Sequence, residues 1–162
     1  MDQNETTMGQ GLGQLAPTIF VDTFIHGLDA KKRLTIPADW RSLVGKPEQL
    51  FVMPSAVERC LAVYPARTLA ARMKKLSELS EVDTDAQNQL RELSANANLV
   101  PWDAQGRIRI KDQLLDYADL KSDVVMVGVF GRFELWSPEL WKLKQPGIDQ
   151  QKIGRAARSV GL

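Results

Sequence analysis

The 162-residue sequence has very few of the residues that build disulfides or metal sites: one cysteine, Cys60, and one histidine, His26. A single cysteine excludes an internal disulfide framework, which makes the reducing cytoplasm the default location. Neither residue belongs to a recognisable motif, and the sequence has no metal-ligand spacing. We therefore expect no metal site and no cofactor.

Long hydrophobic runs and a strong excess of one charge are missing as well. No apolar stretch approaches the roughly 20 residues that span a bilayer, and the N-terminus has no basic and then apolar secretory signal. The formal net charge is +1. We therefore expect a cytoplasmic protein without a membrane partner, in which only local basic patches can engage nucleic acid.

Signatures of catalysis are also lacking. The sequence has no glycine-rich loop that would cradle a phosphate and no G-x-S-x-G nucleophile elbow. The lone Cys60 is more typical of a small core residue than of a nucleophile. The sequence thus predicts a protein that is not an enzyme and has no small-molecule substrate.

What the sequence does contain is a long internal repeat. Residues 28–36 (LDAKKRLTI) return as residues 102–110 (WDAQGRIRI), and in both copies an Asp-Ala-x-x-Arg pentapeptide stands between apolar segments. The register persists beyond this motif, because residues 50–53 match residues 124–127. A repeat of this length indicates one supersecondary unit that is built twice.

Each copy predicts the same order of elements: a hairpin of two strands around a polar turn, a short helix, and two more strands. In the first copy these are a strand at 19–28, a turn at 29–33, a strand at 33–36, a helix at 38–44 and strands at 49–54 and 60–64. In the second copy they are a strand ending at 102, a turn at 103–107, a strand at 107–110, a helix at 112–118 and strands at 123–129 and 132–136. Further helices are predicted from Pro65 to about residue 79, at 86–95, and after Ser137-Pro138-Glu139.

These patterns divide the chain into five segments. They are a disordered N-terminal tail at 1–18, a first repeat at 19–64, a helical connector at 65–96, a second repeat at 97–145 and a basic C-terminal tail at 146–162. A copy of about 50 residues would be marginally stable alone, so we expect residues 19–145 to form one compact domain. Two fused copies predict a small α+β barrel whose hairpins pair across a pseudo-twofold axis.

The recurring pentapeptide has two compatible interpretations. In the structural one, Asp29 accepts backbone N–H bonds in an Asx-turn, and Arg33 pairs with it to brace the hairpin. In the functional one, the turn projects Arg33 and Lys31 outward while Asp29 fixes the guanidinium. An arginine held in this way can grip a phosphate, or the O6 and N7 edge of guanine, through two hydrogen bonds.

Two other groups of residues have a possible nucleic-acid role and a simpler one. The basic helix that begins at Pro65 is more typical of a solvated face or a subunit contact than of a groove-reading helix. The tryptophans occupy equivalent places in strands and helices, which favours packing in the core or at a subunit interface over a base-stacking platform. They are Trp40, Trp102, Trp136 and Trp141.

Residues 26–37 (HGLDAKKRLTIP), the second Asp-x-x-x-Arg motif at 102–110, and the strand pair at 124–137 follow one another with a characteristic order and spacing. Tyr64-Pro65 stands where a long middle helix would begin. This ordered set resembles the MraZ family of bacterial transcriptional regulators, and the resemblance covers roughly residues 20 to 142.

The resemblance implies a duplicated AbrB-like swapped-hairpin β-barrel with short helices and a longer middle helix, assembled into a homo-oligomeric ring. It implies a nucleoid-associated regulator that binds double-stranded DNA at short direct repeats, in the promoter of the division and cell-wall gene cluster. By position, it assigns the DNA contacts to Arg33 and Lys31 of the first turn. Lys32 departs from the family pattern, and as a basic residue it would add a phosphate contact. The DNA-contacting residues would be Arg33, Lys31 and Lys32, and the turn-organising residues Asp29, Asp103 and Arg107.

The sequence departs from the family pattern at two places. Lys32 stands where the family usually has glycine, although Gly106 is retained in the second turn. Val21 and Asp22 stand where an Arg-Gly pair is expected, which changes the charge beside the expected DNA face. The alternative function is therefore a ring-forming structural or interaction protein of the same fold that has lost or altered DNA recognition. Salt-sensitive retention on heparin or on repeat-containing DNA would separate the two.

Overall fold

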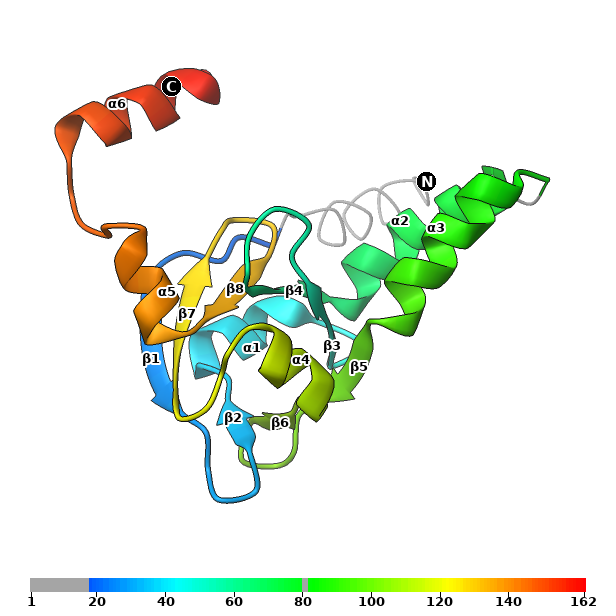
Figure 1. The fold of residues 1–162 in the computed structure, drawn as a ribbon, viewed down its shortest axis with the longest axis horizontal. Helices are drawn as coiled ribbons and strands as arrows, with labels where there is room; N and C mark the ends of the chain where they lie inside the picture. The colour runs from blue at the N-terminus through cyan, green and yellow to red at the C-terminus, as the bar shows by residue number, and fades with distance from the viewer. Residues whose placement is uncertain (1–17, 80–81) are drawn as a thin grey trace, which may run out of the picture.

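The computed structural model describes residues 18–79 and 82–162 and places eight strands and six helices along them (Figure 1). In chain order they are β1 (Thr23–Gly27), β2 (Arg33–Thr35), α1 (Ala38–Val44), β3 (Gln49–Pro54), β4 (Leu61–Pro65), α2 (Ala66–Leu79), α3 (Thr84–Ala95), β5 (Asn98–Pro101), β6 (Arg107–Arg109), α4 (Asp112–Tyr117), β7 (Asp123–Gly128), β8 (Phe133–Trp136), α5 (Pro138–Leu143) and α6 (Gln150–Ser159). The predicted order of elements recurs in both copies. Of the expected disordered tail at 1–18, all but Thr18 lies outside the described residues.

Two antiparallel sheets interleave the two copies. The larger sheet has the strand order β1-β7-β8-β4-β3-β5, and β2 pairs with β6 in a two-stranded ribbon. β1 of the first copy pairs with β7 of the second, with Thr23 opposite Val127. β5 of the second copy pairs with β3 of the first, with Pro101 opposite Gln49. The two strands around each polar turn therefore lie in different sheets, and the turn does not close a simple two-stranded hairpin.

One hydrophobic core joins both copies. In the β2–β6 ribbon, Leu34 and Ile108 face inward and are buried, while the flanking arginines Arg33 and Arg107 lie on the outer face, as strand alternation requires. Further core residues occupy matching positions in the two copies: Ile36 and Ile110, Trp40 and Leu114, Leu50 and Val124, and Val52 and Met126. Because each face is completed by the other copy, neither half would bury its apolar side chains alone.

Trp40 and Trp136 serve packing, the role favoured for the tryptophans. Trp40 is buried in the core, its ring centroid lies 4.7 Å from that of Phe133, and its Nε1 donates to the carbonyl of Val21 at 3.1 Å. Trp136 is buried as well, with its ring centroid 5.6 Å from that of Trp141. A buried indole whose N–H is paired is an anchor of the fold rather than an exposed platform for bases.

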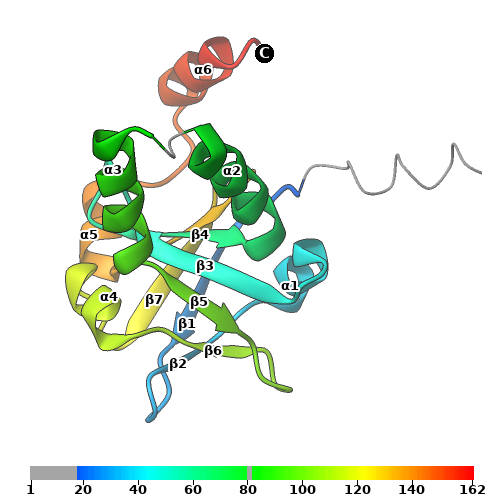
Figure 2. The same cartoon turned by 90° about the vertical axis from the view of Figure 1, so that its right-hand side faces the viewer.

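Two details of the helices differ from the predictions. Pro65 is the last residue of β4 and not the first residue of α2, because it still lies opposite Leu50 in the pairing of β3 with β4. The basic segment after residue 146 contains α6, which the sequence pattern did not predict. Asp149 caps this helix by accepting a hydrogen bond from the N–H of Lys152 at 3.0 Å. α6 stands apart from the sheets and the other helices (Figures 1 and 2).

The described part of the chain contains no helix that is both long and apolar enough to cross a bilayer. Nor do three His, Cys, Asp or Glu side chains gather anywhere in residues 18–79 and 82–162 in a way that could hold a metal ion. Cys60 is fully buried, and burial raises the pKa of its thiol to about 12. His26 on β1 hydrogen-bonds the carbonyl of Thr35 through Nδ1 at 2.8 Å, which ties β1 to β2.

Candidate nucleic-acid interface

The first polar turn is organised by the carboxylate of Asp29. Its Oδ1 accepts hydrogen bonds from the backbone N–H of Lys31 at 2.9 Å and of Arg33 at 2.8 Å, and its Oδ2 accepts one from Nε of Arg33 at 2.7 Å. The backbone closes the same turn, because the N–H of Lys32 donates to the carbonyl of Asp29. Asp29 therefore holds an Asx-turn and orients the guanidinium of Arg33 at the same time.

The second polar turn repeats this arrangement atom for atom. Oδ1 of Asp103 accepts from the N–H of Gln105 at 2.9 Å and of Arg107 at 3.0 Å, and its Oδ2 accepts from Nε of Arg107 at 2.9 Å. The N–H of Gly106 donates to the carbonyl of Asp103, as Lys32 does to Asp29. The duplicated pentapeptide thus encodes a duplicated turn.

Both aspartates are stabilised as anions by the turns they organise. The backbone N–H of Arg33 lowers the pKa of Asp29 below its ordinary value, and the Arg33 side chain and the N–H of Lys31 act in the same direction. The N–H of Arg107, followed by its side chain, lowers the pKa of Asp103 in the same way. At neutral pH each turn therefore presents a charged carboxylate that is already engaged with its own arginine.

The two turns lie close together at the ends of the β2–β6 ribbon. Nη1 of Arg107 is 3.8 Å from Oδ2 of Asp29, so the carboxylate of the first turn also faces the arginine of the second. In the ribbon, Arg33 lies opposite Arg109, and Thr35 lies opposite Arg107. This register gathers three arginines on one outer face.

A shallow concavity opens on this outer face. Its lining consists of Arg33, Arg107, Arg109, Pro101, Trp102 and Asp103. The sequence analysis did not single out Arg109 as a site residue, nor did it place Trp102 at the site. The signal for Arg109 was present in the alternation of residues 107–110, because the residue two places after Arg107 faces the same side of a strand. Trp102 gave no such signal, because its position depends on how the two copies interleave.

The glycine position of the turn differs between the two copies. Lys32 has a φ of 59° and Gly106 a φ of 77°, so this position is left-handed in both turns. A lysine there costs about 1 kcal/mol, because its Cβ crowds the backbone. A Cβ on Gly106 would lie 2.5 Å from Cζ of Arg41. The guanidinium of Arg41 ends a flexible side chain, so the second turn accepts a larger residue here only if Arg41 moves and gives up its hydrogen bond to the carbonyl of Ile36.

The side chain of Lys32 extends from the first turn to the second copy of the repeat. Its Nζ lies 3.3 Å from Oδ1 of Asp112, at the first residue of α4. The same oxygen of Asp112 accepts from Nη2 of Arg109 at 2.7 Å. The hydrogen bonds from Arg109 and then from Lys32 lower the pKa of Asp112. One carboxylate therefore holds two of the cations around the ribbon.

The three residues predicted to contact DNA are placed differently within the first turn. Lys31 is exposed at its tip. Lys32 is engaged with Asp112, and the side chain of Arg33 is 30% exposed. The Arg33 side chain donates from Nε to Asp29, and its terminal nitrogens Nη1 and Nη2 have no hydrogen-bond partner among the described residues. The turn therefore brings the three cations together and leaves Arg33 oriented with its terminal nitrogens free.

The departure at Val21 and Asp22 lies elsewhere than the sequence analysis placed it. The carbonyl of Asp22 accepts from the N–H of Gly128, at the end of β1 opposite to the Asp29 turn. Asp22 therefore does not place its charge beside the Asp29 turn, to which the DNA contacts were assigned. Asp22 has a φ of 81°, and its Oδ1 accepts from the N–H of Thr23 at 2.7 Å. Aspartate tolerates this backbone geometry better than most residues, which explains how it can replace a glycine.

Comparison with known proteins matches most of the chain, up to the start of α6, to one family. The profile of the family described as "MraZ protein, putative antitoxin-like" matches twice, at residues 19–92 and 93–151. The chain is 31% identical over 145 residues to the transcriptional regulator MraZ of Clostridium tetani, which covers 89% of this chain and 100% of that protein. The protein of the same name from Halothermothrix orenii is 36% identical over 146 residues, with 89% and 100% covered. The one from Lactiplantibacillus plantarum is 39% identical over 124 residues, with 76% and 86% covered. The double match confirms that the chain consists of two copies of one unit.

Proposed function

Because the chain belongs to the MraZ family, we propose that it is a sequence-specific DNA-binding transcriptional regulator that acts on the nucleoid. Its relatives from three bacteria are named as transcriptional regulators. The observation that carries the proposal is the guanidinium of Arg33, which Asp29 orients through Nε. Its two terminal nitrogens remain for a ligand, and they match the spacing of two phosphate oxygens or of guanine O6 and N7.

The shape of the site supports a duplex as the ligand. A two-stranded ribbon fits the major groove of B-DNA, and β2 and β6 form such a ribbon with arginines on its outer face. A pre-oriented guanidinium loses little side-chain entropy on binding, so more of the interaction is retained as affinity. In this proposal Arg33 contacts bases or phosphate, and Lys31 and Lys32 contact phosphate. Asp29, Asp103 and Arg107 hold the turns in shape.

The interleaved sheets support the swapped-hairpin interpretation of the fold. Each polar turn joins two strands whose ladder partners come from the other copy. In this proposal the chain is a duplicated AbrB-like barrel, in which the two turns emerge side by side from one end. The duplication would replace the dimer that a single copy would otherwise need.

A ring assembly would make the site effective. One subunit that offers a few phosphate contacts would bind weakly and would lose affinity steeply with salt. Several identical subunits in a ring would place their turns on successive direct repeats, and linked contacts raise avidity on the order of 10²–10⁴-fold. We therefore include promoter direct repeats and a homo-oligomeric ring in the proposal.

The decisive experiment is Arg33→Ala, measured by mobility shift on duplexes that the wild-type protein selects from randomised DNA. The expected result is loss of the shifted band, with an unchanged circular dichroism spectrum and an unchanged assembly mass. The control is Arg72→Ala, which removes the same charge from an exposed position on α2 and leaves binding intact. Equal affinity of wild type and Arg33→Ala would overturn the assignment and favour a structural protein of the same fold.

A further inference from the structure

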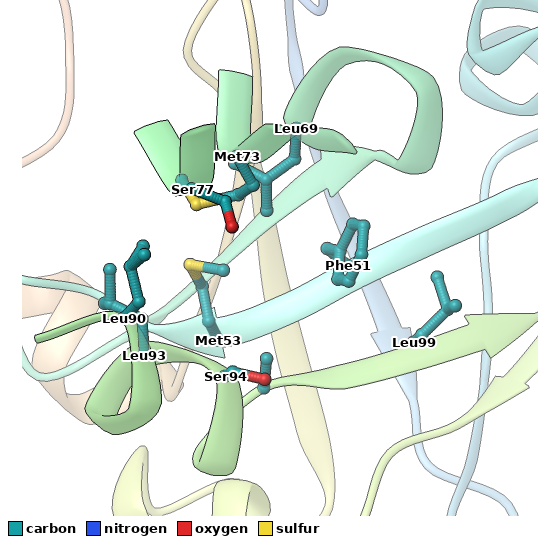
Figure 3. A pocket seen from close by; sticks show the side chains of 10 residues that line it. Phe51, Met53, Leu69, Met73, Ser77, Leu90, Leu93, Ser94 and Leu99 are labelled. Atoms are coloured by element: carbon teal, nitrogen blue, oxygen red, sulfur yellow. The ribbon is translucent and has the colours of Figure 1, made fainter. Parts of the chain in front are cut away.

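The middle helices and the edge of the large sheet enclose an apolar groove of about 420 Å³ (Figure 3). Leu69 and Met73 of α2 form one side, Leu90 and Leu93 of α3 form the other, and Phe51 of β3 lies on the floor. The remaining lining residues are Met53, Ser77, Ser94, Ala97 and Leu99. None of these residues carries a charge, so the groove suits an apolar side chain or helix face.

Within residues 18–79 and 82–162 the groove is open to solvent. Leu93 and Leu99 are 46% and 47% exposed, although each has its side chain directed at the groove. Leu99 lies on β5, which is an edge strand of the six-stranded sheet. An uncovered apolar groove beside a sheet edge is a site where another element is expected to bind.

The C-terminal helix α6 has an apolar face that no other described part of the chain buries. Ile153 and Ala157 of α6 and Val160, its C-cap residue, follow one another at helical spacing. Ile153 and Val160 are 56% and 72% exposed, and no residue of α6 is buried. Apart from its caps, α6 is joined to the rest of the described chain by a hydrogen bond from Nζ of Lys152 to the carbonyl of Gln145, in the link to α5.

The length of α6 shows that it needs a partner. It has 10 residues, and isolated helices shorter than about 12–15 residues are marginal in water. Gly154 in its middle weakens it further relative to alanine. Packing of the apolar face against another surface is what stabilises most such helices.

We propose that α6 of one copy docks into the groove between α2, α3 and β5 of a neighbouring copy. The charges favour this partner. α6 and its cap carry Lys152, Arg155 and Arg158 against Asp149, whereas α3 and its cap carry Asp83, Asp85 and Glu92 against Arg91. α2 is basic, so the helix is expected to turn the flank that carries Lys152, next to the apolar stripe, toward α3. The apolar stripe of Ile153, Ala157 and Val160 would then face the uncharged lining of the groove.

This contact is heterologous, because it joins two different surfaces of the same chain. Repetition of such a contact produces a ring when the rotation closes. The inference therefore rests on the ring assembly proposed above and specifies the surfaces that would hold it together. It does not involve the Asp29 turn, so the two proposals can fail separately.

Cross-linking between separately prepared chains tests the contact. One chain carries Ile153→Cys and the other Leu93→Cys, both in a Cys60→Ala background, and the mixture is treated with a short bismaleimide. The expected product is a covalent heterodimer. Arg155→Cys replaces Ile153→Cys in the matched control, and since position 155 lies on the opposite side of the helix, this pair should give little or no product. A doubly substituted chain that cross-links only to itself would overturn the proposal, because α6 would then bind its own groove.

A second variant measures the assembly directly. Ile153→Asp places a charge on the apolar stripe of a helix that its own chain does not bury, so the fold should be retained. Light scattering after size exclusion is expected to show a smaller mass for Ile153→Asp than for Gln151→Asp, which adds the same charge to the polar side. An equal mass for the two variants would overturn the proposal. Arg33→Ala should lose DNA binding and still cross-link, which separates the two proposals.

Discussion

Lys32 and Asp112 form an ion pair between the two copies, with Nζ and Oδ1 3.3 Å apart. Asp112 holds Arg109 through the same oxygen, at 2.7 Å. If DNA binds as proposed, this carboxylate would compete with phosphate for two cations at the ribbon. Asp112 lies outside both pentapeptides, and it limits the unpaired positive charge at the candidate interface.

We predict that Asp112→Asn strengthens DNA binding. The neutral amide releases Lys32 and Arg109 for phosphate, and because exposed ion pairs contribute about 0.2–1 kcal/mol, the gain should be roughly twofold to fivefold. The slope of log affinity against log salt should steepen as well, because more counterions are released. Asp119→Asn is the control, since it breaks a similar surface pair, with Lys121 at 3.2 Å. Weaker binding by Asp112→Asn would show that Asp112 positions these cations for DNA and does not withhold them.

The left-handed position of the turn leads to a second prediction. Lys32→Gly should raise the free energy of unfolding by about 0.5 kcal/mol, because relief of the left-handed strain exceeds the loss of an exposed ion pair. The same variant should weaken DNA binding and reduce the salt slope by about 1 if Lys32 contacts a phosphate. Urea unfolding and a salt titration of the mobility shift measure the two effects.

The matched substitution in the second turn should have the opposite effect on stability. In Gly106→Lys the new Cβ would meet Cζ of Arg41 at 2.5 Å, in addition to the strain of a φ of 77°. We expect a loss of about 1–3 kcal/mol in the free energy of unfolding. An equal response of the two turns would contradict the difference in space that the structure shows.

Much of the fold could be predicted from the sequence because it depends on local patterns. Pro37 and Gly45 mark the ends of α1, and Asp83 and Ser137, two residue types that favour this position, cap α3 and α5. The duplicated pentapeptide predicted two similar turns, and both turns have the same hydrogen bonds. Pattern and periodicity report such features directly, since they are set by neighbours along the chain.

Other features depend on contacts between the copies and left no local signal. Lys32 could be read as an extra phosphate contact, but its pairing with Asp112 follows from the approach of α4 to the first turn. The charge of Asp22 was misplaced because strand direction, and not distance along the sequence, decides which end of the sheet it occupies. α6 was missed because its apolar residues are few and its segment is basic.

Burial of the single cysteine gives a prediction about thiol chemistry. Burial, followed by the negative charge of Glu134, raises the pKa of Cys60 to about 12, so the reactive thiolate is scarce at pH 8. Native protein should therefore resist alkylation by iodoacetamide at pH 8 and become fully labelled in urea. Mass spectrometry after timed labelling makes this comparison. Rapid labelling of the native protein would show that Cys60 is accessible and would require a different packing around β4.

The lowered pKa of Asp29 gives the last prediction, and its sign follows from linkage. The pKa in the folded protein lies below the ordinary value of 3.8, so the folded state favours the anion. The stability that this turn contributes is complete above the ordinary value and is lost as the pH falls through the folded pKa. Asp103 and Asp112 are lowered in the same direction and add to the effect.

We therefore expect the free energy of unfolding to be steady from pH 7 to about pH 5 and to fall below about pH 4. In Asp29→Asn the side-chain oxygen can still accept from the backbone, but the charge that holds Arg33 is gone. This variant should be less stable than wild type at pH 7, and its free energy of unfolding should fall less steeply below about pH 4. Urea unfolding at each pH measures both effects. The DNA binding of the variant should weaken at neutral pH, because the guanidinium is less firmly oriented. If the stability of Asp29→Asn fell with acid as steeply as that of wild type, ionisation of Asp29 would not contribute to the acid sensitivity. The charge of Asp29 would then not be what holds the Arg33 side chain.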